Sequence, residues 1–290
     1  MIPAAFDYAR PTSVEEAVRV LAEGGPGATV LAGGQSLLPM LRLRRAAPTL
    51  LVDVGRVPGM RGVRREVGRL VIGAMTTHHE VLHDPLVRRH APLLAAATRT
   101  VGDPAVRHRG TLGGSLAHAD PAADLPPAVL ALDAELVAQG PHGRRTLPAG
   151  EFFAGRLRTA LEPGELLVEI RVPELGADWG FHYEKFRHCA QAAAVVGVAA
   201  AVRRGSGGIV QARIGLANMG ATPLRALAVE AALAGADATA AAVDRAAGAA
   251  AEGAAPPVDR GVDTEYRDHL ARVLTRRAVL AAAGERGWRA

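Results

Sequence analysis

Two turns built on paired glycines stand out in the N-terminal half of this 290-residue chain. The first, Ala32-Gly33-Gly34-Gln35-Ser36-Leu37, follows an apolar segment at 28–32 that is typical of a β-strand. The second is Thr111-Leu112-Gly113-Gly114-Ser115. Adjacent glycines let a backbone approach a ligand with no Cβ in the way, and successive N–H groups in such a turn form an anion-binding concavity. Two such turns in one domain predict a site that binds a diphosphate from two sides.

A simpler interpretation of either Gly-Gly pair, taken alone, is a tight turn that holds no ligand. Neither turn matches the G-x-G-x-x-G fingerprint of a Rossmann dinucleotide site. The sequence also has no G-x-x-x-x-G-K-[ST] loop. A Rossmann domain and nucleoside triphosphate hydrolysis are therefore disfavoured, while a different kind of dinucleotide site stays open.

The bulk composition indicates a soluble globular protein of two domains. Hydrophobic residues make up 49% of the chain, and the longest apolar run, 190–202, is too short to span a bilayer. The N-terminus lacks the basic and apolar segments of a secretory signal, so we expect a cytoplasmic location. The single cysteine, Cys189, excludes an internal disulfide and an iron–sulfur cluster held by this chain alone.

The net charge of +5 raises the question of nucleic-acid binding. The basic residues are interspersed with acidic ones, and aromatic residues make up only 3% of the chain, so we expect no nucleic-acid partner. Every basic residue except Lys185 is arginine, which makes that one lysine a candidate for a specific role.

Helix signals are clear in the N-terminal half. Ser13 and Glu16 have capping-box spacing, and Val14, Ala17, Val18 and Leu21 follow at helical spacing. A second helix is expected at 86–98.

The C-terminal part begins after a change of composition near 173–177. A small-residue apolar segment at 192–203, the turn Gly205–Gly208 and the segment 209–217 predict a hairpin, and the remainder is expected to be helical. We place a domain boundary near Leu175, which divides the chain into domains 1–175 and 176–290.

Two long sequence words carry a resemblance to a known family. They are Ala32-Gly33-Gly34-Gln35-Ser36-Leu37-Leu38-Pro39 and the segment from Arg109-Gly110-Thr111 to Asp124-Leu125-Pro126. Tyr183-Glu184-Lys185-Phe186 and Glu265-Tyr266-Arg267 extend the match towards the C-terminus. With these words the chain resembles the FAD-binding medium subunits of the molybdenum hydroxylases, the group of aerobic carbon monoxide dehydrogenase and xanthine dehydrogenase.

The resemblance implies an α+β fold. It consists of a two-lobed FAD-binding domain of the vanillyl-alcohol-oxidase type, with lobes at about 1–56 and 57–175, and a smaller C-terminal domain with an antiparallel sheet and helices. It also implies partners: a small subunit with two [2Fe–2S] clusters and a large molybdopterin subunit. The flavin would collect electrons from the clusters and deliver them to an external acceptor such as a quinone, dioxygen or NAD.

Two other functions remain open from the residues. The chain would be a free-standing flavin oxidoreductase if the isolated protein turned over a reduced organic donor. It would be an assembly protein with a decayed cofactor site if it purified without flavin absorbance, although the intact glycine turns argue against decay.

The resemblance also implies which residues contact FAD. Residues around the two turns would hold the diphosphate, Val101 and Gly102 would lie against the flavin or its ribityl chain, and Lys185 would place a cation near the ring, raising its reduction potential. No catalytic residue and no metal ligand is expected on this chain. The implied contacts are Leu31, Ala32, Gly33, Gly34, Gln35, Ser36, Leu37, Val101, Gly102, Thr111, Gly113, Gly114, Ser115, Asp120, Asp124, Leu167 and Lys185.

Several of these residues have a structural alternative. Asp124 would also suit a helix N-terminus, Leu167 a strand core and Lys185 a solvated surface. Relatives often carry asparagine where Ser115 stands, which leaves the contact there open. The adjacent His78 and His79 are expected to be structural or surface residues, and Cys189 is expected to be inert.

Overall fold

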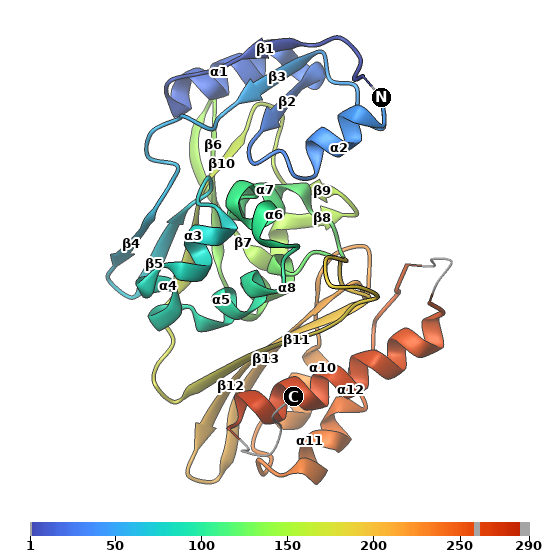
Figure 1. Cartoon of the computed structure of the whole chain (residues 1–290). Helices are drawn as coiled ribbons and strands as arrows, with labels where there is room; N and C mark the ends of the chain where they lie inside the picture. The colour runs from blue at the N-terminus through green and yellow to red at the C-terminus, as the bar shows by residue number, and fades with distance from the viewer. Residues whose placement is uncertain (1, 258–261, 285–290) are drawn as a thin grey trace.

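The computed structural model describes residues 2–257 and 262–284. In Figure 1 the chain runs from an N-terminal lobe at one end, through a central region of sheet and helices, to a C-terminal region at the other end. Within the described residues the main sheets are one parallel sheet of three strands and two antiparallel sheets, of five and four strands. The predicted α+β class is confirmed.

The N-terminal lobe is a small parallel sheet with strand order β1-β3-β2. Its helix α1 buries the four apolar positions that the helical spacing predicts, Val14, Ala17, Val18 and Leu21. The elements are β1 (Asp7–Ala9), α1 (Val14–Gly24), the 3-10 turn η1 (Gly25–Gly27), β2 (Ala28–Leu31), α2 (Leu37–Arg42) and β3 (Leu50–Asp53).

Helix α1 begins with half of the expected capping box. The Ser13 side chain accepts the N–H of Glu16 at 3.1 Å, as expected. The Glu16 carboxylate, however, accepts from the backbone N–H of Thr12 at 2.7 Å and from its hydroxyl at 2.8 Å. The reciprocal bond to the Ser13 N–H is therefore a wrong prediction, because the preceding threonine offers two donors instead of one.

The central region is built on an antiparallel sheet with strand order β4-β5-β10-β6-β7. Its strands are β4 (Val63–Glu66), β5 (Arg69–Gly73), β6 (Glu135–Gly140), β7 (Gly143–Pro148) and β10 (Leu166–Pro173). The other elements are α3 (His78–His83), α4 (Pro85–His90), α5 (Pro92–Arg99), α6 (Pro104–Arg109), α7 (Leu112–His118), α8 (Leu125–Ala131), α9 (Ala149–Phe152) and the short pair β8 (Phe153–Gly155) and β9 (Arg158–Thr159).

The helix expected at 86–98 is two helices. Helix α4 ends at His90 and α5 begins at Pro92, with Ala91 between them in a non-helical conformation. Proline has no N–H to donate and its ring clashes with the preceding turn, so Pro92 is tolerated at the start of a helix and not in its interior.

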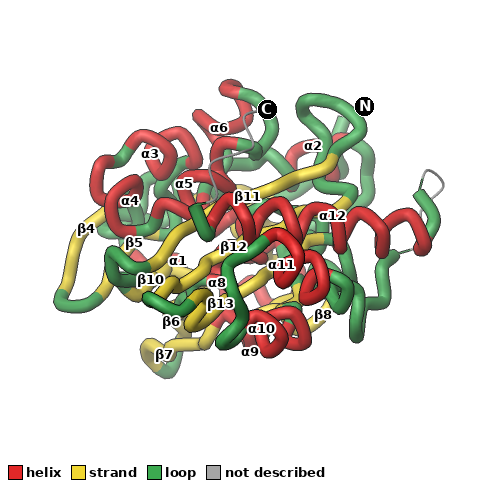
Figure 2. The backbone as a smooth tube through the Cα atoms, turned by 90° about the horizontal axis from the view of Figure 1, so that it is seen from below, coloured by secondary structure: helices red, strands yellow, loops and turns green. Residues whose placement is uncertain are grey.

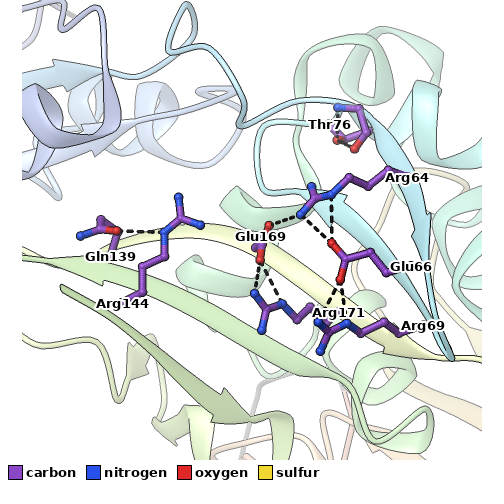
Figure 3. A network of polar contacts seen from close by, with 9 residues as sticks. Arg64, Glu66, Arg69, Thr76, Gln139, Arg144, Glu169 and Arg171 are labelled. Carbon is purple, nitrogen blue, oxygen red and sulfur yellow. Dashed lines mark hydrogen bonds and ion pairs between the residues drawn. The ribbon is translucent and has the colours of Figure 1, made fainter.

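Charged side chains link strands β4, β5 and β10 of the central sheet (Figure 3). Glu169 on β10 accepts from Arg64 on β4 at 2.8 Å and from Arg171 at 2.6 Å, and Glu66 links Arg64 to Arg69. Burial raises the pKa of Glu169, but hydrogen bonds from the two arginines outweigh it and hold that pKa below its ordinary value. The pairs fasten the edge strand β4 to the sheet.

The C-terminal region is an antiparallel sheet with helices on one face (Figures 1 and 2). The predicted hairpin is confirmed, since β12 and β13 pair from Gly197–Ala217 to Gly205–Gly208. The elements are β11 (Trp179–Phe186), β12 (Val196–Gly205), β13 (Gly208–Ala217), β14 (Leu224–Arg225), α10 (Leu227–Leu233), α11 (Ala240–Ala247) and α12 (Thr264–Ala282).

Strand β12 is buried on both faces, because Ala199 and Ala201 belong to the hydrophobic core of the central region while Val198 and Ala200 belong to the core under α10–α12. Helix α8 lies so close to β13 that a Cβ at Gly215 would stand 2.2 Å from the carbonyl oxygen of Pro127. Small residues therefore let strands β12 and β13 of the C-terminal region pack directly against the central region. In the described part of the chain we find no helix with the length and hydrophobicity needed to cross a membrane.

Candidate cofactor-binding site

The first glycine turn connects the end of β2, Leu31, to the start of α2, Leu37. Gly34 has φ +75°, a left-handed conformation that glycine adopts at little cost. The backbone N–H groups of Gly33 to Ser36 donate no hydrogen bond to any residue in the described ranges. A hollow of about 430 Å³ opens beside the turn, lined by Gly34, Gln35, Leu38, Pro39, Arg42 and Leu43. Consecutive unpaired amides of this kind suit an anion.

The two glycine turns lie against each other. A Cβ at Gly33 would stand 2.2 Å from the carbonyl oxygen of Arg109 and 2.8 Å from the Cα of Gly110. A Cβ at Gly114 would lie 3.4 Å from the Cβ of Ala32. The first turn therefore rests on the segment just before the second, and glycine at position 33 is required by this close approach.

The second turn differs from expectation, because it forms the first turn of helix α7 and its amides are already paired. The N–H of Gly113 donates to the carbonyl of Ala74 at 2.8 Å, and that of Gly114 to the hydroxyl of the N-cap residue Thr111 at 3.1 Å. The N–H of Ser115 donates to the Thr111 carbonyl at 3.0 Å. The expected second row of free amides is thus wrong.

The glycines of the second turn serve close packing. A Cβ at Gly113 would stand 2.5 Å from the Cβ of Ala74. A Cβ at Gly114 would stand 2.7 Å from the hydroxyl oxygen of Thr111. The hydroxyl of Ser115 makes no hydrogen bond within the described residues.

Asp124, Tyr183 and Lys185 form a buried polar cluster between α8 and β11. The Lys185 ammonium lies 2.8 Å from one oxygen of Asp124, and the Tyr183 hydroxyl donates to the other oxygen at 2.8 Å. Lys185 also donates to the carbonyl of Thr100 at 3.2 Å. The side chains of Lys185 and Asp124 are 3% and 6% exposed. Burial, and then the charge of Asp124, raise the pKa of Tyr183 well above its ordinary value, so the phenol stays a donor.

This cluster excludes the solvated-surface alternative for Lys185, whereas Asp124 does occupy the N-terminal position of α8 that its structural alternative requires. Asp124 precedes α8, but its side chain makes no capping bond to that helix. Lys185 is not a solvated surface charge. The carboxylate of Asp124 balances the positive charge of Lys185. The pair can therefore offer a neighbouring group hydrogen-bond donors but little net charge.

The other candidate residues described here lie in loops or in the hydrophobic core. Val101 and Gly102 form the loop between α5 and α6, where Gly102 has φ +47°. Asp120 accepts the N–H of Ala122 at 2.9 Å in the loop after α7. Leu167 is 4% exposed and belongs to the hydrophobic core.

His78, His79 and Cys189 differ in their surroundings. His78 is buried, its Nδ1 makes no hydrogen bond in the described structure, and burial, with the nearby charge of Arg107, lowers its pKa to about 4. His79 stacks on His108 with ring centroids 3.9 Å apart. Cys189 is exposed and free. No group of His, Cys, Asp or Glu side chains within residues 2–257 and 262–284 is arranged to hold a metal ion.

Sequence reasoning missed Tyr183 and the Arg109-Gly110 backbone as parts of this region. The signal for Tyr183 was present, because residues two apart on a strand project on the same face, as Tyr183 and Lys185 do. The contact of Gly33 with Arg109 had no local signal.

Comparison with known proteins agrees with this geometry. Residues 4–175 match the family described as "FAD binding domain in molybdopterin dehydrogenase", and residues 181–282 match "CO dehydrogenase flavoprotein C-terminal domain". The carbon monoxide dehydrogenase medium chain of Hydrogenophaga pseudoflava is 42% identical over 282 residues, which cover 97% of this chain and 98% of the relative.

Solved structures also align closely with this chain. A carbon monoxide dehydrogenase structure from Hydrogenophaga pseudoflava aligns with a TM-score of 0.95 and 45% identity, covering 98% of each chain. Quinoline 2-oxidoreductase from Pseudomonas putida 86 aligns with a TM-score of 0.93 and 36% identity, again covering 98% of each chain.

The fold and these matches define a flavoprotein whose cofactor is FAD. The chain belongs to the family of FAD-binding medium subunits of molybdenum hydroxylases, in its carbon monoxide dehydrogenase-like group.

Proposed function

We propose that this chain carries FAD for a molybdenum hydroxylase and passes electrons from iron–sulfur clusters in a partner subunit to an external acceptor. The observation that carries the proposal is the row of unpaired amides from Gly33 to Ser36, held against the Arg109-Gly110 backbone. A diphosphate needs several donors fixed in advance, and this turn supplies them without a Cβ in the way.

The proposed site is divided between the two ends of the cofactor. The segment from Leu31 to Leu37 would hold the diphosphate, with Thr111, Gly113, Gly114 and Ser115 closing over it from the second turn. Val101, Gly102, Asp120, Asp124, Leu167 and Lys185 would contact the flavin half. When bound, FAD accepts electrons singly or in pairs and releases them to an acceptor. The residues of this chain bind it, orient it and shield it from water.

Lys185 would act on the flavin mainly through hydrogen bonding. An ammonium has three N–H donors, of which one goes to Asp124 and one to the carbonyl of Thr100. The third is left for the cofactor. Because Asp124 balances the charge, we expect a weaker electrostatic effect on the reduction potential than an unpaired lysine would produce.

The proposed partners are a small subunit with two [2Fe–2S] clusters and a large molybdopterin subunit. The single cysteine of this chain supports that division, since such clusters need several thiolates. Substrate would be oxidised in the large subunit, so we expect this chain to be inactive on it alone. The acceptor would be a quinone, dioxygen or NAD. A cytoplasmic location and a boundary between domains 1–175 and 176–290 belong to the same proposal.

A charge placed in the first turn tests the diphosphate site. Ser36→Asp keeps a good N-cap residue before α2 and should leave the fold intact. Its carboxylate would oppose the diphosphate by about 1–4 kcal/mol per charge pair at about 4 Å, which weakens FAD binding by roughly tenfold or more. Thr239→Asp makes a similar change at the N-cap of α11, away from this turn, and should bind FAD as the unchanged protein does.

The measurement is FAD binding followed by flavin fluorescence, with the melting temperature as a check on folding. Equal FAD binding by both variants and the unchanged protein would remove the first turn from the site.

A pull-down from the native organism tests the electron-transfer role. Tagged chain should recover an iron–sulfur subunit and a molybdopterin subunit. The alternative, a free-standing flavin oxidoreductase, predicts that the chain purifies alone and turns over a reduced organic donor by itself.

A further inference from the structure

The loop between α5 and α6 has its carbonyl groups held by two cations. Nη1 of Arg107 donates to the carbonyl of Val101 at 2.9 Å and lies 3.4 Å from those of Arg99 and Gly102. Lys185 donates to the remaining carbonyl, that of Thr100, at 3.2 Å. Four successive carbonyl oxygens are therefore contacted by Arg107 or Lys185.

This arrangement orients the amides of the same loop. In a planar trans peptide the N–H points opposite to the carbonyl of the preceding residue. With the Val101 and Gly102 carbonyls turned towards Arg107, the N–H groups of Gly102 and Asp103 must point away from it. Neither N–H donates a hydrogen bond to any residue in the described part of the chain. Two further unpaired donors are thus presented on the outer side of the loop.

Helix α6 connects these donors to the first glycine turn. It begins just after the loop, with Asp103 as its N-cap, and ends at Arg109, whose carbonyl touches Gly33. Its six residues span about 9 Å at 1.5 Å per residue. One rigid element therefore separates two sets of free amides. FAD likewise has two polar acceptor groups apart from each other, the diphosphate and the carbonyl and imine edge of the flavin ring.

We propose that Arg107 is a positioning residue, which turns the amides of Gly102 and Asp103 towards the polar edge of the flavin ring. The inference rests on the proposed function, in which the turn from Gly33 to Ser36 holds the diphosphate. Arg107 itself does not touch the cofactor. It acts through its contacts with carbonyl groups on the far side of the loop. Lys185 binds the one remaining carbonyl group, that of Thr100.

Arg107→Gln is the main test, compared with Arg107→Lys and with Arg88→Gln as a matched control. Arg88 also donates to a backbone carbonyl, that of Leu82 at 2.9 Å, but it lies on α4, outside the proposed site. The ligands are FAD and ADP, since ADP keeps a diphosphate and has no flavin ring. Binding to the full chain is measured by calorimetry, and the visible flavin absorption of the FAD complex is measured beside it.

We expect Arg107→Gln to weaken FAD binding by roughly tenfold, the worth of one or two hydrogen bonds, with ADP binding unchanged. The flavin absorption bands should shift, because the donors at the ring edge change. Arg107→Lys should recover part of the affinity, and Arg88→Gln should behave as the unchanged protein does.

Three results would overturn the inference while leaving the proposed function standing. FAD binding unaffected by Arg107→Gln would remove the loop from the ring site. Equal weakening of FAD and ADP would mean that Arg107 supports the whole fold or the diphosphate turn. Equal affinity of the unchanged protein for FAD and ADP would mean that the ring has no donors there. If the unchanged protein bound neither ligand, the proposed function would fail as well.

Discussion

Acidification should destabilise this chain through one buried histidine, His78. The residue is 4% exposed, it lies beneath Gly110, and its pKa is lowered from 6.5 to about 4. The folded state therefore keeps the neutral imidazole, whereas the unfolded chain takes up a proton near pH 6.5. Between these two values the unfolded state binds more protons, so stability falls as the pH falls.

The size of the effect follows from the two pKa values. They differ by about 2.5, and each pKa unit is worth about 1.36 kcal/mol, which gives a full loss of about 3 kcal/mol below pH 4. About 2 kcal/mol of this should already be lost at pH 5. The contribution is complete above pH 6.5 and disappears as the pH falls through about 4.

His78→Leu isolates this contribution from the other acid-sensitive groups. Carboxylates such as Glu165 and Glu169, whose pKa values are lowered, also lose stabilising ion pairs in acid, but they do so equally in both proteins. At neutral pH the variant should be no less stable, because leucine removes a buried nitrogen that lacks a partner.

The assay is urea unfolding followed by circular dichroism at pH 7.5 and pH 5, for the variant and the unchanged protein. The unchanged protein should lose about 2 kcal/mol more than His78→Leu on acidification. An equal loss in the two proteins would refute the reasoning, since it would place the proton uptake elsewhere.

Further predictions concern the buried cluster and the second glycine turn. Tyr183→Phe removes one donor from the buried carboxylate of Asp124 and should cost about 1–3 kcal/mol in the free energy of unfolding, measured in urea. Lys185→Met leaves that carboxylate without its cationic partner and should cost about 3–5 kcal/mol in the free energy of unfolding. Adding Asp124→Asn should restore part of this loss, and effects of the two changes that simply add would contradict the ion pair. Gly113→Ala should cost about 1–3 kcal/mol because its Cβ meets Ala74, whereas Gly150→Ala, with nothing within 4 Å, should be neutral, and thermal melting of the two checks this.

Local features of the fold were predictable from the sequence. The spacing of Val14, Ala17, Val18 and Leu21 gives the buried face of α1 correctly, and the hairpin across Gly205–Gly208 is correct, because both depend on neighbours within a few residues. The break at Pro92 was also a local signal, which the apolar spacing of 86–98 obscured.

Features that depend on distant segments were not predictable in this way. Strand β10 lies between β5 and β6, a position decided by long-range pairing. In the second glycine turn, the N–H groups of Leu112 and Gly113 are paired because Thr76 and Ala74, more than thirty residues away, supply carbonyl partners. The N–H groups of Gly114 and Ser115 pair locally with Thr111. For the site, the free amides at Gly33 to Ser36 follow from a local motif. The family resemblance implied FAD contacts for both Lys185 and Asp124, but the ion pair between them was not predicted.

The pairing of Asp124 with Lys185 and Tyr183 has a consequence for protein engineering. One member lies on α8 and the other two lie on β11, so a cut near residue 175 would separate them. A fragment ending there would carry an unbalanced carboxylate beside the loop at Thr100. Chimeras that exchange C-terminal regions between relatives should therefore transfer a matched β11, because the flavin half of the proposed site is assembled from both sides of that junction.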